Sequence, residues 1–338
     1  FFSNAMKAVA LNAARLNFDG RVSFDRLRDI AALSCHDVSD PARPEEILKR
    51  VAGHDVVINK EMPLDGALIA RFPPCVRLIC EAGTGFNNID CEAARAKGIA
   101  VCNIPTYSTE AMAHMAITFV MAQSCSLVPQ ARALATGDRA HFDRCHLAAL
   151  PHFELSGKTL GLVGGLGTIG RRVAAIAGAL GMRVLASSRS APPGPLAEGG
   201  IEVAPLEDLL RRSDFVSIHC PLTPDTTGLI DAAALRLMKP TAFLINTARG
   251  AIVDEAALVD ALRERRIAGA ALDVLGPGAA PPPAPPADHP LFALDNVILT
   301  PHIGWQRVET RQRVVEQVTD NVIAFAKGQP TNVVNGLC

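Results

Sequence analysis

Short apolar runs alternate with segments of helical periodicity along nearly the whole chain. This alternation is typical of parallel sheets whose strands are joined by crossover helices. The first third of the chain predicts four strands, at Lys7–Leu11, Val56–Asn59, Leu78–Cys80 and Ala100–Asn103. From Thr159 a second series is predicted, at Leu160–Val163, Val184–Ala186, Phe215–His219, Phe243–Asn246, Ala270–Asp273 and Val297–Thr300.

Two series of strands indicate two domains. Between them a long helical segment, Ser108 to about Ala122, carries apolar residues almost all round and is expected to be buried. The pattern predicts an α/β protein with two Rossmann-like, doubly wound parallel-sheet domains and a cleft between them. We expect residues 6–107 and 305–338 to form one domain and residues 108–304 to form the other. Residues 1–5 are interpreted as the remnant of an expression tag.

Composition narrows the class of protein. The 338 residues carry a net charge of -1, which favours neither nucleic acid nor an anionic membrane as a partner. No apolar stretch is long enough to span a bilayer. Nine cysteines are scattered without a CxxC pair, which indicates reduced thiols and a cytoplasmic location. No spacing of metal ligands is found, so no metal is expected.

A glycine-rich turn follows the strand predicted at Leu160–Val163. In a GxGxxG turn between a strand and a helix, the first glycine permits the bend and the second admits a pyrophosphate. The third glycine lets the helix pack, with its first amides facing the anion. The candidate cofactor residues here are Gly165, Gly167, Thr168, Ile169 and Gly170. The alternative is a purely structural turn.

The next predicted strand indicates which nicotinamide cofactor is used. An NAD site usually places an acidic residue there for the ribose 2′-hydroxyl, but this chain has Ser188 and Arg189. A hydroxyl and a guanidinium suit a 2′-phosphate, so NADP is predicted in preference to NAD. The alternative is that Arg189 points into water.

Several motifs together resemble the D-isomer-specific 2-hydroxyacid dehydrogenases. They are Gly157–Gly161, Asn246–Gly250 leading to Val253–Glu255, Ala271–Val274 and Thr300–Gly304. The resemblance extends from Val56 to Asn335 and is greatest to the glycerate dehydrogenase, or hydroxypyruvate reductase, branch. It implies a flavodoxin-like substrate-binding domain at 6–107 and 305–338, an NAD(P)-binding Rossmann domain at 108–304, and a homodimer.

The resemblance also implies roles for single residues. Arg249 would bind the carboxylate and carbonyl oxygen of the substrate, as its fork of charged donors allows. His302 would protonate the carbonyl oxygen as hydride arrives. The substrate loop would be Ala82, Gly83, Thr84 and Gly85, whose amides bind the same carboxylate. Further cofactor contacts would come from Cys220, Pro221, Thr247, Ala248, Asp273, His302 and Gly304.

Other residues near these motifs have less specific interpretations. Asp254 is assigned to capping a helix. Phe86, Tyr107 and Trp305 are candidates to line the side-chain pocket of the substrate, and each is equally a candidate for ordinary packing.

One catalytic residue of the family is missing. Relatives carry a glutamate that hydrogen-bonds the histidine, but the expected position falls at Gly278 or Ala280, within the proline-rich loop Gly276–Pro290. Three explanations stay open. His302 works alone, with slower reduction near neutral pH; a carboxylate such as Glu81 replaces the glutamate; or catalysis is lost while cofactor binding survives.

The function predicted from the sequence is therefore reduction of a small 2-oxo acid, of the hydroxypyruvate or glyoxylate type, by an NAD(P)-dependent dehydrogenase. The alternative is a catalytically weak nucleotide-binding or sensing protein on the same scaffold. A pure binding protein has no chemical need for Arg249 or His302, so the enzyme is favoured.

Overall fold

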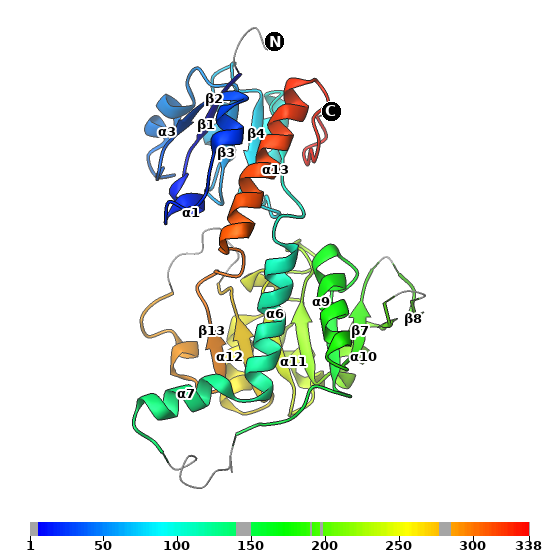
Figure 1. Cartoon of the computed structure of the whole chain (residues 1–338). Coiled ribbons are helices and arrows are strands. Elements are labelled where there is room, and N and C mark those ends of the chain that lie inside the picture. The colour runs from blue at the N-terminus through cyan, green and yellow to red at the C-terminus, as the bar shows by residue number, and fades with distance from the viewer. Residues whose placement is uncertain (1–5, 140–149, 190, 197–198, 277–284, 338) are drawn as a thin grey trace. The chain divides into compact units, whose positions relative to one another are not determined.

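The computed structural model describes residues 6–139, 150–189, 191–196, 199–276 and 285–337. These residues form two compact units. Unit 1 contains the described residues up to Ser108 and those from Trp305 onward, and unit 2 contains the described residues from Thr109 to Gly304. Figure 1 labels many of their helices and strands.

Unit 1 is built on a five-stranded parallel sheet with the order β2-β1-β3-β4-β5. Every residue of β3, β4 and β5 is buried, which explains why these strands are mostly apolar rather than alternating, with a polar residue only at the end of β3 (Asn59) and of β4 (Glu81). The strands are β1 (Met6–Ala10), β2 (Ala31–Cys35), β3 (Val56–Asn59), β4 (Leu78–Glu81) and β5 (Ala100–Cys102).

The helices of unit 1 are short except for the last. They are α1 (Ala14–Asn17), α2 (Asp25–Arg28), α3 (Pro44–Val51), α4 (Gly66–Ala70), α5 (Cys91–Ala96) and α13 (Val308–Ala326). Asp65 and Asp90 cap α4 and α5 by accepting a backbone N–H three residues on. Arg311 fastens α13 to the start of the unit, because its buried guanidinium donates to both carboxylate oxygens of Asp19.

Unit 2 has an eight-stranded sheet in which only β8 is antiparallel. Its order is β13-β12-β11-β10-β6-β7-β9-β8, so the direction of winding reverses between β6 and β10. In open α/β sheets, ligands bind beyond the carboxyl ends of the strands at such a reversal. The strands are β6 (Thr159–Val163), β7 (Arg183–Ser187), β8 (Gly194–Pro195), β9 (Ile201–Val203), β10 (Phe215–Ile218), β11 (Phe243–Asn246), β12 (Gly269–Leu272) and β13 (Val297–Leu299).

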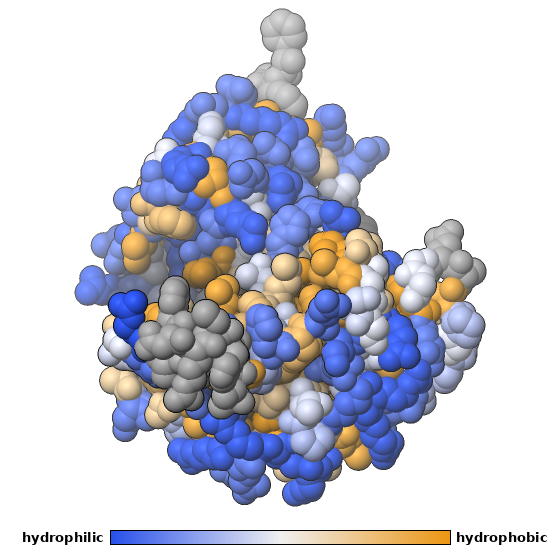
Figure 2. Space-filling view, turned by 60° about the horizontal axis from the view of Figure 1, so that its bottom comes forward, coloured by the Kyte–Doolittle hydropathy of each residue, from blue (hydrophilic) through white to orange (hydrophobic). Residues whose placement is uncertain are grey.

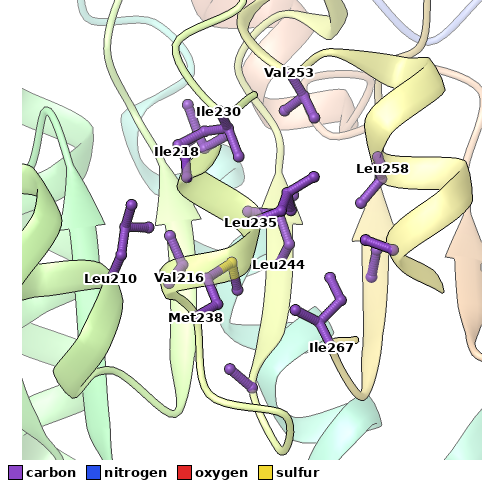
Figure 3. Packing of buried hydrophobic residues seen from close by; sticks show 14 of the residues in the cluster. Leu210, Val216, Ile218, Ile230, Leu235, Met238, Leu244, Val253, Leu258 and Ile267 are labelled. Carbon is purple, nitrogen blue, oxygen red and sulfur yellow. The ribbon is translucent and has the colours of Figure 1, made fainter. Parts of the chain in front are cut away.

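Helices cover both faces of this sheet, as the alternation of side chains along β10 shows. Val216 and Ile218 pack against α10, α11 and α12 (Figure 3), whereas Phe215 packs against α6 and α9 on the other face. The helices are α6 (Thr109–Ser124), α7 (Leu127–Ala135), α9 (Thr168–Ala179), α10 (Leu206–Arg212), α11 (Ala232–Leu237) and α12 (Glu255–Arg263), with short 3₁₀ turns η1 (Gly250–Ile252) and η2 (Pro290–Ala293).

The structure confirms the predicted fold class and the ten predicted strands, with ends that move by one residue. The predicted helix after Ser108 is α6, and it is buried on nearly all sides, as expected. Asp254 caps α12 by accepting the N–H of Ala257, which confirms its assignment. Three strands were not predicted, namely β2, β8 and β9.

Among the described residues, no single helix is long and apolar enough to cross a membrane. The bent pair of α6 and α7, with 64° between them, has sufficient length and apolar composition, but α6 is a core helix of unit 2. On the face shown in Figure 2, hydrophilic residues predominate and hydrophobic ones are dispersed among them.

Candidate active site

The predicted cofactor turn lies between β6 and α9, as the sequence indicated. Gly167 is the N-cap of α9 and offers no side-chain cap, so the first amides of the helix remain available to an anion. A Cβ on Gly167 would meet only the Gly164 carbonyl oxygen, at 3.6 Å, which leaves room for a diphosphate. By contrast, a Cβ on Gly170 would lie 2.5 Å from the carbonyl oxygen of Gly165, so helix and turn can pack this closely only with glycine there. The turn therefore fits a dinucleotide.

Gly164 directly precedes the GxGxxG turn, and its neighbour Cys220 explains why this position is also a glycine. Its φ of +79° is left-handed, and a Cβ would lie 2.6 Å from the backbone nitrogen of Cys220. Cys220 and Pro221 follow β10, so the close approach of Gly164 brings the turn against the next candidate cofactor segment.

Arg189 is paired in the structure, which the sequence did not indicate. Its Nη1 donates to Oδ2 of Asp225 at 3.0 Å, and the two side chains are 74% and 75% exposed. An ion pair this exposed contributes little free energy, so the guanidinium can exchange Asp225 for another anion. Ser188 and Arg189 directly follow β7, on the same edge of the sheet as the glycine turn.

The segment after β11 places Arg249 on a turn closed by one side chain. Asn246 accepts the N–H of Ala248 on Oδ1 and donates its Nδ2 to the carbonyl oxygen of Arg249. The buried hydroxyl of Thr247 has no hydrogen-bond partner among the described residues. A buried hydroxyl left unpaired is costly, so a polar group of a bound cofactor is its natural partner.

The segment after β13 places His302 on a strained turn. Its φ of 55° lies in the left-handed region that residues other than glycine rarely adopt. Asp273, fully buried at the end of β12, holds this turn through the hydroxyl of Thr300 and the amides of Ile303 and Gly304. Asp273 thus fixes the backbone on both sides of His302.

The candidate residues of unit 2 share one position in the fold. Each directly follows a parallel strand: β6, β7, β10, β11, β12 or β13. The structure therefore brings the glycine turn, the pair Ser188 and Arg189, Arg249 and His302 to one edge of one sheet. No group of His, Cys, Asp or Glu in the described ranges is arranged to hold a metal ion.

In unit 1, the predicted substrate loop directly follows β4. The amide of Ala82 was predicted to bind the carboxylate, but it donates to the carbonyl oxygen of Asn59 at 2.7 Å and is not open. The amides of Gly83, Thr84 and Gly85 donate to no acceptor among the described residues, which suits a loop that receives an anion. The carbonyl oxygen of Gly83 accepts the N–H of Ile104, and Asn103 donates to the carbonyl oxygen of Thr84. The carbonyl groups are thus held while the amides remain open.

Glu81, the suggested replacement for the missing glutamate, already accepts hydrogen bonds on both carboxylate oxygens within unit 1. It is fully buried, and Oε2 accepts from the side-chain amides of Asn59 and Asn88 while Oε1 accepts the N–H of Glu61. Burial raises its pKa to about 7, although Lys60 and these donors lower it. These contacts argue against Glu81 as the partner of His302. Gly278 and Ala280, where the glutamate was expected, lie outside the described residues.

Comparison with known proteins agrees with this geometry. Residues 119–304 match the family model described as D-isomer specific 2-hydroxyacid dehydrogenase, NAD binding domain. The chain belongs to this family. As a 2-hydroxyacid dehydrogenase it is an NAD(P)-dependent oxidoreductase, and a catalytically weak nucleotide-binding protein is not favoured.

Individual relatives of this dehydrogenase cover most of its length. A glyoxylate reductase of Aeropyrum pernix is 44% identical over 264 residues, which are 78% of this chain and 77% of the relative. A glycerate dehydrogenase of Methylorubrum extorquens is 37% identical over 294 residues, 86% and 88% of the two chains. The solved NADPH-dependent glyoxylate/hydroxypyruvate reductase of Sinorhizobium meliloti, in complex with NADP and malonate, has a TM-score of 0.81 at 28% identity and covers 98% of this chain and 97% of its own.

Two residues beside the predicted sites were not singled out from the sequence. Asp225 pairs with Arg189 from 36 positions along the chain, and no local pattern marks it. Lys60 is buried directly after β3 and lies against Gly83. A lysine at the end of the buried strand β3 was the signal that could have found it.

Proposed function

We propose that this dehydrogenase reduces a small 2-oxo acid of the hydroxypyruvate or glyoxylate type. The observation that carries the proposal is the position of Arg249 and His302 on the same sheet edge as the glycine turn of β6 and α9. The names of the relatives, glyoxylate reductase and glycerate dehydrogenase, support the size and class of the substrate.

The nicotinamide cofactor, when bound, supplies the hydride. The residues that would hold it lie after the unit 2 strands. The open amides at the start of α9 suit its diphosphate, and the unpaired hydroxyl of Thr247 would find a polar partner on it. Cys220 and Pro221 would line the same edge beside the glycine turn, with Ala248, Asp273 and Gly304 next to the catalytic turns.

Arg249 would bind the carboxylate and polarise the carbonyl group of the substrate. Its Nη1 donates to the carbonyl oxygen of Ala248 at 2.8 Å, which orients the guanidinium. Its remaining donors are then available for two substrate oxygens. The open amides of Gly83, Thr84 and Gly85 in unit 1 are donors of the kind that a carboxylate requires.

His302 would donate the proton to the carbonyl oxygen. An imidazole N–H is the donor that general acid catalysis uses most often. We propose that His302 does this without a glutamate, since Glu81 is occupied. The turn held by Asp273 supplies the orientation that a glutamate would otherwise help to set.

NADP is proposed as the preferred cofactor. Arg189 can leave Asp225 for a 2′-phosphate, which carries more charge than a carboxylate and accepts more hydrogen bonds. The NADPH named for the Sinorhizobium meliloti reductase supports this proposal.

The surroundings of the enzyme follow from the same proposal. We propose that unit 1 is the substrate-binding domain and that unit 2 is the NAD(P)-binding domain. A cytoplasmic location is proposed from the nine cysteines, which include no CxxC pair. The absence of nucleic-acid or membrane partners is proposed from the net charge of -1. A homodimer is proposed because helix α7 has no buried residue.

Oxidation of NADPH and of NADH, followed by absorbance, tests the function against hydroxypyruvate, glyoxylate, pyruvate and a bulkier 2-oxo acid. Turnover of the small acids is expected, with kcat/KM reduced by a factor of roughly 1,000 in Arg249→Ala. Arg263→Ala, an exposed arginine on α12, is the matched control and should retain activity. If NADPH binds tightly and no acid is reduced between pH 5 and 8, the function is a nucleotide-binding one instead.

A further inference from the structure

Lys60 is a buried lysine that faces the predicted substrate loop. It is 2% exposed, and its Nζ donates to Oε1 of Glu61 at 2.8 Å. A Cβ on Gly83 would lie 3.4 Å from this Nζ and 3.3 Å from Oε1 of Glu81. The ammonium group is thus directly in front of the loop whose amides are open. Burying a lysine is costly, so its place beside this loop calls for an explanation.

Two aromatic rings surround the ammonium group. Nζ of Lys60 lies 3.9 Å from the ring centroid of Trp305 and 5.5 Å from that of Tyr107, which are cation–π distances. Trp305 is itself 2% exposed, and its indole Nε1 has no acceptor among the described residues. An indole N–H buried without a partner loses a hydrogen bond that it makes in water. The donor is therefore suited to a ligand that brings an acceptor.

The charges around Lys60 indicate what kind of group fits. Glu61 accepts from Lys60 on one oxygen and from Arg15 on the other, at 2.6 Å, and its φ of 61° is left-handed. Lys60 is thus already neutralised, and a second anion would also face the buried Glu81. A neutral group that both donates and accepts hydrogen bonds suits an ammonium and carboxylate pair better. A hydroxyl is the simplest such group.

We propose that Lys60, Glu61 and Trp305 form a subsite for a hydroxyl group on the carbon next to the carbonyl of the 2-oxo acid. The inference rests on the proposed function and adds its specificity. A carboxylate on the amides of Gly83 to Gly85 places the rest of a short 2-oxo acid beside Lys60. The hydroxymethyl group of hydroxypyruvate would bind there. The methyl group of pyruvate would leave the indole N–H of Trp305 unpaired, and glyoxylate would not reach it.

Lys60→Met tests this by the ratio of kcat/KM for hydroxypyruvate to kcat/KM for pyruvate. The ratio is expected to fall by roughly 10- to 100-fold, because an active site built to bond a hydroxyl discriminates strongly against substrates that lack it. Lys49→Met, an exposed lysine on α3, is the matched control and should leave the ratio unchanged. An equal loss for both acids, or an unchanged ratio, would overturn the proposal.

Trp305→Phe is the second variant, in case Lys60→Met does not fold. It removes the indole N–H but keeps an aromatic ring and alters no charge. The same ratio is expected to fall by several-fold, and a ratio equal to that of the wild type contradicts the role of Trp305. If the wild-type enzyme reduces neither acid, the proposed function fails first, so the two failures are distinguishable.

Binding without turnover gives an independent measurement. Trp305 is the single tryptophan of the chain, so intrinsic fluorescence reports on this subsite alone. Titration with D-glycerate, in the absence of cofactor, is expected to change the emission at lower concentrations than titration with D-lactate, which lacks the hydroxyl on C3. Lys60→Met should abolish the difference between the two acids. Equal responses of the wild type to both acids would argue against the subsite.

Discussion

Arg189 illustrates how one surface side chain can decide which cofactor is used. It follows β7, where dinucleotide-binding folds contact the ribose, and within the described residues its guanidinium pairs with Asp225. Asp225 competes with a 2′-phosphate for the same guanidinium. The proposed preference for NADPH would therefore depend on the balance between these two anions.

Changing either partner should shift that preference in opposite directions. Arg189→Ala is expected to lower kcat/KM for NADPH about tenfold, because a charge-assisted contact is lost, and to leave NADH nearly unaffected. Asp225→Ala is expected to raise kcat/KM for NADPH, because it removes the competitor. Steady-state kinetics with both cofactors measure this. A parallel change for NADPH and NADH in Arg189→Ala would show that Arg189 does not contact the 2′-position.

Glu81 is a residue whose ionisation should oppose folding. Burial raises its pKa to about 7 from an ordinary value of 4.5. Between pH 4.5 and about pH 7, Glu81 keeps its proton in the folded state, whereas in the unfolded chain it has released that proton. Raising the pH through this window therefore lowers the free energy of unfolding, and the full cost is present above pH 7.

Glu81→Gln should remove this pH dependence. Relative to the variant, the wild type is expected to lose on the order of 3 kcal/mol of unfolding free energy between pH 5 and pH 8. Urea unfolding followed by Trp305 fluorescence measures the unit that contains Glu81. Glu92→Gln, an exposed glutamate on α5, is the control. A difference between wild type and Glu81→Gln that does not vary with pH would contradict the raised pKa.

At the scale of elements, the chemistry depends on how strand ends are held. The turn after β13 keeps His302 at a φ of 55°, and the buried carboxylate of Asp273 supplies the bonds that maintain this conformation. Thr300 contributes through its hydroxyl, which donates to Asp273 at 2.5 Å. The turn is a rigid support for the side chain proposed to donate the proton.

Thr300→Val keeps the shape of the side chain and removes that hydroxyl. We expect kcat to fall about tenfold with little change in KM for NADPH, because His302 loses orientation while the cofactor turn is untouched. Thr118→Val, which removes an exposed hydroxyl on α6, is the control. If Thr300→Val changes KM for NADPH and leaves kcat intact, the turn serves the cofactor rather than the proton transfer.

The elements that the sequence predicted and those it missed differ in burial. β3, β4, β6 and β11 are buried along their whole length, so their apolar runs are unmistakable. β2 lies at a sheet edge with only its first residue buried, and β8 and β9 have two and three residues. Short or half-exposed edge strands carry no periodic signal and depend on pairing with a neighbour.

For the site, local sequence motifs predicted that the candidates of unit 2 follow strands. The residues that contact these candidates were not predictable. The pairing of Arg189 with Asp225, the contacts of Asp273 around His302 and the cluster at Lys60 join residues far apart in the chain. Such contacts depend on the order of the strands in the sheet, which local sequence patterns do not determine. The roles of Arg249, His302 and the loop at Gly83 stay predictions.

In the whole molecule, α7 is the helix proposed to form the interface with a second copy of the chain. It extends from the end of α6 away from the unit 2 sheet (Figure 1) and buries none of its residues. Leu127 and Leu134 on it are 58% and 48% exposed. Apolar side chains on such a helix are typical of an interface.

Leu127→Asp combined with Leu134→Asp is therefore expected to convert a dimer into a monomer. Sedimentation velocity at micromolar concentration measures the mass. Val38→Asp changes an equally apolar side chain in unit 1, 70% exposed, and should leave the dimer intact. A wild-type protein that sediments as a monomer would contradict the proposed homodimer.

The reaction proposed for this enzyme is hydride transfer to C2 of a 2-oxo acid. It is tested with NADPH deuterated in turn at each of its two transferable positions, with hydroxypyruvate as the acceptor and analysis of the product by mass spectrometry and chiral chromatography. We expect D-glycerate with deuterium at C2 from one of the two labelled cofactors. Product without deuterium at C2, the L-isomer, or tight NADPH binding with no product would contradict it.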